Sequence, residues 1–255
     1  MKIRVKNINK TFSLSNGVQL NVLDKINFDI REGDFVVILG ESGCGKSTLL
    51  NIIAGLLPPS SGEVWVDGRS ITDPDHSISM LFQQPSLLPW LNVEENIAFG
   101  CRLRGEIGDL RVRVDHFIKM VGLGGFEYFH PSELSTGLAY RTCLARALIG
   151  SPEVYLLDEP FGSLDTFSRA RLQGEFLNIR RREGFTTVFV THDIDEAILL
   201  GNKIVLLGGR PSSITASFDI DFSYPRILTD KSCNDVKEKI LKAFRDTFKE
   251  NGENE

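Results

Sequence analysis

The chain has 255 residues, of which 42% are hydrophobic and 25% are charged, so its composition is that of a globular protein with a sizeable core and excludes a disordered chain. The formal net charge of −5 gives no basic field that would attract a phosphate backbone, and nucleic acid is therefore not expected as a partner. The opening segment lacks the apolar run of a secretory signal, and no stretch approaches the roughly 18 apolar residues of a membrane span, so we expect a cytoplasmic protein whose membrane role is at most peripheral.

The N-terminal part of the chain reads as strands followed by one helix. Short apolar alternations between Ile3 and Asp29 predict an antiparallel β layer. The apolar run Phe35–Leu39 predicts the first parallel strand, and Lys46–Gly55 is expected to be helical. The cluster Pro58–Glu63 predicts a turn, after which the segments VWV and SMLF read as short strands.

The middle of the chain is predicted to be mostly helical, over Leu87–Gly150, with a break at Gly122–Gly125. Strand patterns return in the segments VYLL, TVFVT and KIVLL, with helices expected at Phe167–Arg182 and Ile194–Leu200. Strands that alternate with helices predict an α/β fold around a parallel sheet. The middle stretch, about residues 87–152, is therefore interpreted as a helical subdomain inserted into that α/β core.

The end of the chain has a different pattern. Its composition becomes polar after Ile227, while apolar residues keep a near-helical spacing at Val236, Ile240, Leu241, Phe244 and Phe248. This spacing predicts one amphipathic terminal helix. We therefore expect a main domain over residues 1–229 and a C-terminal helix and tail over residues 230–255.

A glycine-rich segment between the first parallel strand and its helix fits the phosphate loop pattern G-x-x-x-x-G-K-S/T. Its residues are Gly40, Glu41, Ser42, Gly43, Cys44, Gly45, Lys46, Ser47 and Thr48. Glycines let the backbone turn N–H groups toward phosphate, and the helix N-terminus adds a favourable field. Lys46 is expected to contact the β and γ phosphates, and Ser47 is expected to bind Mg²⁺. The alternative is a glycine-rich turn with a chance lysine, which the strand–loop–helix order disfavours.

The four cysteines form no CxxC pair, which favours reduced thiols over a disulfide or a zinc site. Cys44 differs from the others because it lies inside the phosphate loop, beside Lys46 and a helix N-terminus. Such surroundings lower the pKa of a thiol and make it reactive where reagents reach it. Packing could also bury this thiol and leave it inert.

Two adjacent carboxylates, Asp158 and Glu159, close the apolar strand that begins at Val154. A carboxylate at this end of a strand can hold the Mg²⁺ shell, which is the role predicted for Asp158. Glu159 is placed to polarise an attacking water, which implies hydrolysis and not mere binding. Solvated acids at a strand end would be the simpler interpretation if the chain had no phosphate loop.

In this order of motifs the chain resembles the ATP-binding-cassette (ABC) ATPases, over essentially its first 227 residues. The resemblance implies a P-loop NTPase core with a mostly parallel sheet, an N-terminal antiparallel β layer and an inserted helical subdomain, together with ATP and Mg²⁺ as cofactors. Phe82-Gln83-Gln84 resembles the Q-loop, in which Gln83 would reach Mg²⁺ and the water. Thr191-His192-Asp193 resembles the switch histidine, and Phe12 matches the aromatic residue that stacks on adenine.

The remaining motifs imply two copies of the chain. Leu134-Ser135-Thr136-Gly137-Leu138 occupies the signature position, at which Ser135, as a helix N-cap, and Gly137 would close on nucleotide bound to the opposite subunit. Ser163-Leu164-Asp165 resembles the D-loop, and Asp165 is assigned to nucleotide binding with it. Thr136 departs from the family's glycine. It would be strained if that position needs positive φ, and tolerated as the first residue of an ordinary helix.

Finer features resemble the importer branch for nitrate, sulfonate, taurine and related compounds: Leu88-Pro89-Trp90, the segment Phe161–Asp165, Arg210-Pro211-Ser212 and Tyr224-Pro225-Arg226. The resemblance implies a peripheral ATPase on the cytoplasmic face of the membrane, a homodimer that energises uptake through separate integral-membrane permease subunits and, indirectly, an extracytoplasmic solute-binding protein. The substrate cannot be read from the sequence. The alternatives are a regulatory or weakly hydrolysing ABC subunit, because of the altered signature, and a soluble non-transport ABC ATPase.

Overall fold

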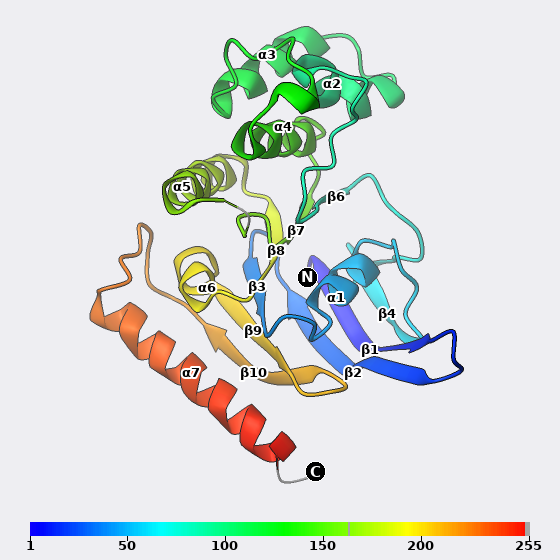
Figure 1. Cartoon of the computed structure of the whole chain (residues 1–255), viewed down its shortest axis with the longest axis vertical. Helices are drawn as coiled ribbons and strands as arrows, with labels where there is room; N and C mark the ends of the chain where they lie inside the picture. Colours follow the sequence, from blue (N-terminus) through cyan, green and yellow to red (C-terminus); the bar gives the residue numbers. More distant parts are fainter. Residues whose placement is uncertain (163, 253–255) are drawn as a thin grey trace. The chain divides into compact units, whose positions relative to one another are not determined.

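The computed structural model describes residues 1–162 and 164–252. The chain divides into two compact units, each of which is described by itself (Figure 1). The first unit combines Met1–Asp75 with the chain from Phe185 onward, and the second unit is His76–Gly184. Ser163, part of the predicted D-loop, lies outside the described residues, as do residues 253–255 of the predicted tail and the side chain of Phe248.

The first unit contains an antiparallel sheet and a group of mostly parallel strands with helices. Its elements are β1 (Ile3–Ser13), β2 (Gln19–Ile30), β3 (Phe35–Leu39), α1 (Lys46–Ile53), β4 (Ser61–Val66), β5 (Arg69–Ser70), β8 (Thr186–Thr191), α6 (Ile194–Leu200), β9 (Lys203–Gly208), β10 (Ser213–Asp219) and α7 (Lys231–Gly252).

The antiparallel sheet has the strand order β2-β1-β4-β5. Buried Ile3 and Val5 of β1 alternate with exposed Arg4 and Lys6, so one face of the sheet supplies core and the other faces water. The sequence predicted this β layer, and the VWV segment belongs to it as part of β4.

The parallel strands are apolar along their whole length because they are buried on both faces. β3 pairs in parallel with β8 on one side and with β9 on the other, and every residue of β3 and β8 is buried. β10 runs antiparallel to β9 and was not predicted. The loop before β10 joins the antiparallel sheet, because the Ser212 N–H donates to the Val22 carbonyl and the Asp24 N–H donates to the Ser212 carbonyl.

Helices complete the first unit. α6 lies against β3 and β8, and α7 lies against α6 and β10, as Figure 1 also shows. The Lys237 ammonium of α7 is 2.6 Å from the Asp195 carboxylate of α6. α7 covers the segment in which helical spacing predicted a terminal helix.

Within the residues that the structure describes, the second unit contains two parallel strands, β6 and β7, and a group of helices. Its elements are β6 (Ile78–Leu81), α2 (Val93–Leu103), α3 (Leu110–Met120), the 3₁₀ turn η1 (Pro131–Glu133), α4 (Thr136–Ile149), β7 (Val154–Asp158) and α5 (Thr166–Glu183). α2, α3 and α4 pack against one another, and the predicted break at Gly122–Gly125 separates α3 from η1. Across the described parts of both units, no helix is both long enough and apolar enough to cross a bilayer.

Candidate functional site

The phosphate loop begins where β3 ends. Leu39, the last residue of β3, pairs with Thr191 of β8 and with Leu206 of β9. The chain then turns through Gly40–Gly45 and enters α1 at Lys46. Because Gly45 has no side chain, the N-cap position offers no side-chain acceptor to the first-turn N–H groups, an arrangement that suits phosphate at a helix N-terminus.

Two glycines of the loop are required by close packing. A Cβ on Gly40 would lie 2.7 Å from the Leu207 carbonyl oxygen. Gly45 has φ 94°, and a Cβ there would lie 2.8 Å from Cγ1 of Val22. Any larger residue would therefore push the loop away from β9 or from β2.

Lys46 is held by the loop that it follows. Its side chain is buried, and its ammonium donates to the carbonyl oxygens of Gly40 at 3.0 Å and of Glu41 at 2.8 Å. A positive charge is thus fixed inside the loop at the helix N-terminus. Ser47 and Thr48 follow in the first turn of α1.

The thiol of Cys44 is buried, with only 8% of the residue exposed. Burial raises its pKa, and this effect outweighs the charge of Lys46 and the backbone N–H groups, which lower it. The prediction of a lowered thiol pKa is therefore wrong. The sequence places the thiol near a cation and a helix N-terminus, but it does not show that the folded loop covers the sulfur.

His192 lies at the same edge of the sheet as the phosphate loop. Because Leu39 and Thr191 are partners across β3 and β8, Gly40 and His192 both follow directly from paired residues. His192 is exposed, and Asp193 after it caps α6 by accepting from the N–H groups of Asp195 and Glu196.

Phe12 lies in β1 of the same unit, where it pairs with Leu20 of β2. Its ring is half-buried, and the Lys10 ammonium lies 5.0 Å from the ring centroid. The ring therefore already has a cationic neighbour, and Lys10 itself donates to the Pro58 carbonyl.

In the second unit the two carboxylates end β7 beside the Q-loop. Leu157 of β7 pairs with Leu81 of β6, so Asp158 and Phe82-Gln83 leave neighbouring strands at the same edge. Asp158 is buried. Glu159 has φ 43°, a left-handed conformation that costs a non-glycine residue about 1–3 kcal/mol and is typical of functional sites.

The Q-loop is fastened to α4. The Tyr140 hydroxyl donates to the Phe82 carbonyl at 3.1 Å, and the Arg146 guanidinium donates to the Ser86 carbonyl at 2.7 Å. Gln83 itself is exposed. The sequence analysis did not identify Tyr140 and Arg146. The available signal was that each is a long polar side chain in a helix that is otherwise largely buried.

The signature segment starts α4 as an ordinary helix. Ser135 is the N-cap, with φ −65°, and its side chain accepts from the Leu138 N–H at 3.3 Å, which confirms the predicted cap. Thr136 is the first helical residue, is exposed and has no positive φ. Of the two alternatives for Thr136, the structure supports the tolerated one. Gly137 follows within the first turn.

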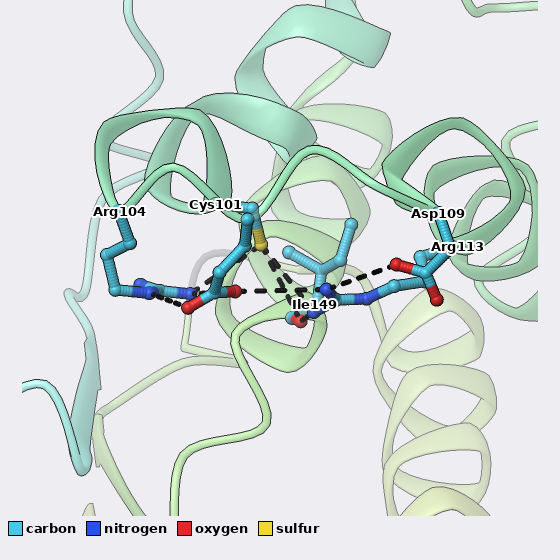
Figure 2. Close-up of polar contacts among 6 residues, drawn as sticks. Cys101, Arg104, Asp109, Arg113 and Ile149 are labelled. Carbon is cyan, nitrogen blue, oxygen red and sulfur yellow. Dashed lines mark hydrogen bonds and ion pairs between the residues drawn. The ribbon is translucent and has the colours of Figure 1, made fainter.

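The far end of α4 is fastened by a polar cluster formed by the end of α2, the start of α3 and the connection between them (Figure 2). The Arg113 guanidinium donates to the Ile149 carbonyl and to the sulfur of Cys101, which is fully buried. Arg104 donates to the same sulfur and pairs with Glu106 at 2.6 Å. The helix that begins with the signature is thus anchored at both ends.

Asp165 is the N-cap of α5. Its carboxylate accepts from the N–H groups of Phe167 and Ser168. The hydrogen bonds from Ser168 and from the backbone lower the pKa of this carboxyl below its usual value.

The structure thus assembles two groups of predicted residues, one in each unit. The phosphate loop, His192 and Phe12 belong to the first unit, and Gln83, the Asp158–Glu159 pair, the signature and Asp165 belong to the second. The residues predicted to bind metal, Ser47, Gln83 and Asp158, offer hydroxyl, amide and carboxylate oxygens, which is the donor set that Mg²⁺ prefers.

Comparison with known proteins agrees with this chemistry. A family model described as ABC transporter matches residues 23–162. The chain is 44% identical over 244 residues to the aliphatic sulfonates import ATP-binding protein SsuB of Bacillus thuringiensis subsp. konkukian (strain 97-27), covering 96% of each chain. It is 42% identical over 234 residues to the Bacillus subtilis (strain 168) protein of the same name, covering 92% of this chain and 91% of that one.

Among solved structures, the dimeric post-hydrolysis state of the ATP-binding cassette MJ0796 bound to ADP and Pi matches with a TM-score of 0.77 and 32% identity, covering 87% of this chain and 100% of that one. The chain therefore belongs to the ABC transporter family. It has the P-loop NTPase fold, and it is an ATPase of this family that uses ATP and Mg²⁺.

Proposed function

We propose that this chain is the ATP-hydrolysing subunit of an ABC importer that takes up a small anionic solute, with aliphatic sulfonates as the substrate class. The observation that carries the proposal is Glu159, a carboxylate held at φ 43° directly after the buried strand that delivers Asp158. A carboxylate held in such a strained conformation is suited to polarise water. The names of the relatives support the substrate class.

The proposed binding roles are supported by the geometry of the phosphate loop and by the family resemblance. The N–H groups of the loop Gly40–Gly45 and the buried ammonium of Lys46 receive the phosphates, and Phe12 stacks on adenine. Ser47, Gln83 and Asp158 would hold Mg²⁺, which would supply positive charge against the phosphates.

The hydrolytic roles fall to residues that follow strand ends. Glu159 accepts a proton from the attacking water, and Gln83 and His192 orient that water and the γ-phosphate. Gln83 leaves β6 beside the acid pair, and the fastening of its loop to α4 gives a physical path by which the nucleotide state reaches the helical segment.

We assign the second half of the active site to a second copy of the chain. The first turn of α4, with Ser135 and Gly137, offers N–H groups to a γ-phosphate bound by the partner, and Asp165, the N-cap of α5, is assigned to the same interface. Because Thr136 occupies a regular helical position, the altered signature is compatible with hydrolysis. The dimeric structure of MJ0796 bound to ADP and Pi supports this arrangement.

The remaining partners and boundaries complete the proposal. The dimer lies on the cytoplasmic face of the membrane, bound to integral-membrane permease subunits, which a solute-binding protein supplies with substrate. The ATPase domain spans residues 1–229, with the helical subdomain at about 87–152, and residues 230–255 form the appended helix and tail.

Purification of the tagged chain from solubilised membranes tests the importer role. We expect a multispan permease to co-purify and ATP turnover to rise when sulfonate-loaded binding protein is added. Recovery of soluble partners without a permease would instead indicate a non-transport ABC ATPase. A complex that binds ATP without turnover would indicate a regulatory subunit.

A further inference from the structure

The segment Tyr224-Pro225-Arg226 has no part in the site described so far, yet it contains a buried charge. Arg226 is 8% exposed, and its guanidinium lies between two rings, 4.1 Å from the centroid of Tyr224 and 5.0 Å from that of Phe222. A cation placed between two aromatic faces is held in one orientation.

Arg226 and Tyr224 bind the carbonyl groups at the end of α6. Nη1 of Arg226 donates to the carbonyl oxygens of Ile198, at 2.6 Å, and of Gly201. The Tyr224 hydroxyl donates to the Leu200 carbonyl. Ile198 and Leu200 belong to the last turn of α6, whose carbonyls lack partners within the helix, and Gly201 is its C-cap. A cation at this end also complements the helix dipole.

α6 depends on such anchors because it is short. It has seven residues, fewer than an isolated helix needs for stability in water. At its start, the Thr191 hydroxyl donates to the Glu196 carboxylate at 2.6 Å, and Asp193 caps the first turn. His192 lies in the chain between Thr191 and Asp193, so a displacement of α6 along its axis or in tilt displaces His192.

We propose that Arg226, together with Tyr224, is a positioning residue for His192 that acts through α6. The inference rests on the proposed role of His192 in hydrolysis. Loss of the anchor at the far end of α6 lets the helix occupy a range of positions, and the fraction of molecules with His192 in place falls. The phosphate loop is built on β3, β9 and β2 and does not use this anchor, so ATP affinity is retained.

The test is a set of variants assayed for ATP turnover and ATP affinity in the intact purified chain. Arg226→Lys keeps the charge but loses the planar guanidinium that lies against the Tyr224 and Phe222 rings, together with the Nε and Nη2 donors to the Phe222 and Ile220 carbonyls. Tyr224→Phe removes one hydroxyl and keeps the ring. Each of these two variants is made in two backgrounds, one with His192 intact and one with His192→Ala. Val64→Ala, a truncation of a buried residue of β4, is the control for a general loss of stability.

We expect Arg226→Lys to lower kcat by about two- to thirtyfold, the range of mutations that alter coupling between sites, and to leave the Kd for ATP unchanged. Tyr224→Phe should show a smaller loss in the same direction. In the His192→Ala background neither change should lower kcat further by more than about twofold, because both act through the removed side chain. Val64→Ala should lower the Tm with kcat retained.

The inference would be overturned if Arg226→Lys lowered kcat by the same factor with His192 intact and with His192→Ala. A Kd for ATP that rises together with the loss of kcat would also overturn it. Normal turnover of both Arg226→Lys and Tyr224→Phe, alongside a slowed His192→Ala, would overturn the inference and leave the proposed function intact. Normal turnover of His192→Ala would overturn the proposed role of His192 itself. If Arg226→Lys does not fold, Tyr224→Phe carries the same comparison.

Discussion

Cys44 and Thr136 show how the surroundings of one residue decide between alternatives that a motif leaves open. Cys44 lies beside a cation and at a helix N-terminus, yet burial is the larger effect on its thiol. Thr136 replaces a glycine of the family pattern, yet it starts a regular helix without strain. In both cases the deciding quantity, burial or φ, belongs to the folded backbone and not to the residue type.

The first prediction concerns the thiol of Cys44. Because burial raises its pKa above the ordinary value of 9.0, the folded state holds the thiol proton more tightly than the unfolded chain does. This contribution to stability is complete below the ordinary pKa and is lost as the pH rises through the folded value. Cys44→Ala should therefore flatten the fall in unfolding free energy at alkaline pH, measured by urea titration.

The same burial should make Cys44 slow to alkylate in the native chain near neutral pH and fast after unfolding. Peptide mapping by mass spectrometry after a maleimide pulse measures both rates. Native labelling as fast as that of the unfolded chain would show that the sulfur is not covered as described.

The second prediction concerns Thr136→Gly. Threonine and glycine are both poor helix formers and no positive φ is relieved, so the unfolding free energy should change by less than about 0.5 kcal/mol. ATP affinity of the monomer should be unchanged, because the phosphate loop belongs to the other unit of the chain. Any change should appear in turnover and in the ATP concentration needed for dimerisation. Loss of monomer ATP binding would contradict the placement of Thr136 on the face that meets a partner.

At the scale of elements, α4 is the central support of the second unit. Ser135 caps its start, Tyr140 and Arg146 fasten the Q-loop to its side, and Arg113 binds the carbonyl of its last residue. The sequence predicted the helix and its cap from local signals. The lateral contacts could not be predicted, because each joins residues that lie tens of positions apart.

The third prediction tests the far anchor of α4. Arg113→Met should destabilise the chain by about 1–3 kcal/mol, because the Ile149 carbonyl loses a charged donor and Glu106 loses a partner. Arg111→Met, an exposed neighbour in α3, is the matched control and should change stability by less than about 0.5 kcal/mol. Thermal or urea unfolding measures both, and equal effects of the two variants would contradict the anchoring role.

At the scale of the whole molecule, the fold could be predicted wherever a segment is apolar throughout or alternates clearly. β3, β7, β8 and β9 are buried runs that read plainly, and α6 was predicted with its observed bounds. β10 was missed although half-buried Ile214, Ala216 and Phe218 alternate with exposed Thr215, Ser217 and Asp219, so a period of two was present in the sequence and was not recognised. The phosphate loop, the acid pair and the switch histidine were found because each follows such a readable strand, whereas the signature was found by its resemblance to the family. The carbonyls that Arg226 binds have no sequence signature.

The central claim is that this chain hydrolyses ATP with Glu159 as the group that activates water. The direct measurement is the turnover of Glu159→Gln beside its ATP affinity. Glutamine keeps the size of the side chain, and it tolerates the same backbone, so the fold and the Kd for ATP should be preserved.

Turnover of Glu159→Gln should fall by about 10²–10⁴-fold, the contribution of a general base, and an ATP-bound dimer should accumulate on size exclusion. Glu153→Gln, an exposed acid shortly before β7, is the matched control and should hydrolyse ATP at the wild-type rate. Near-normal turnover by Glu159→Gln, with ATP binding intact, would contradict the account.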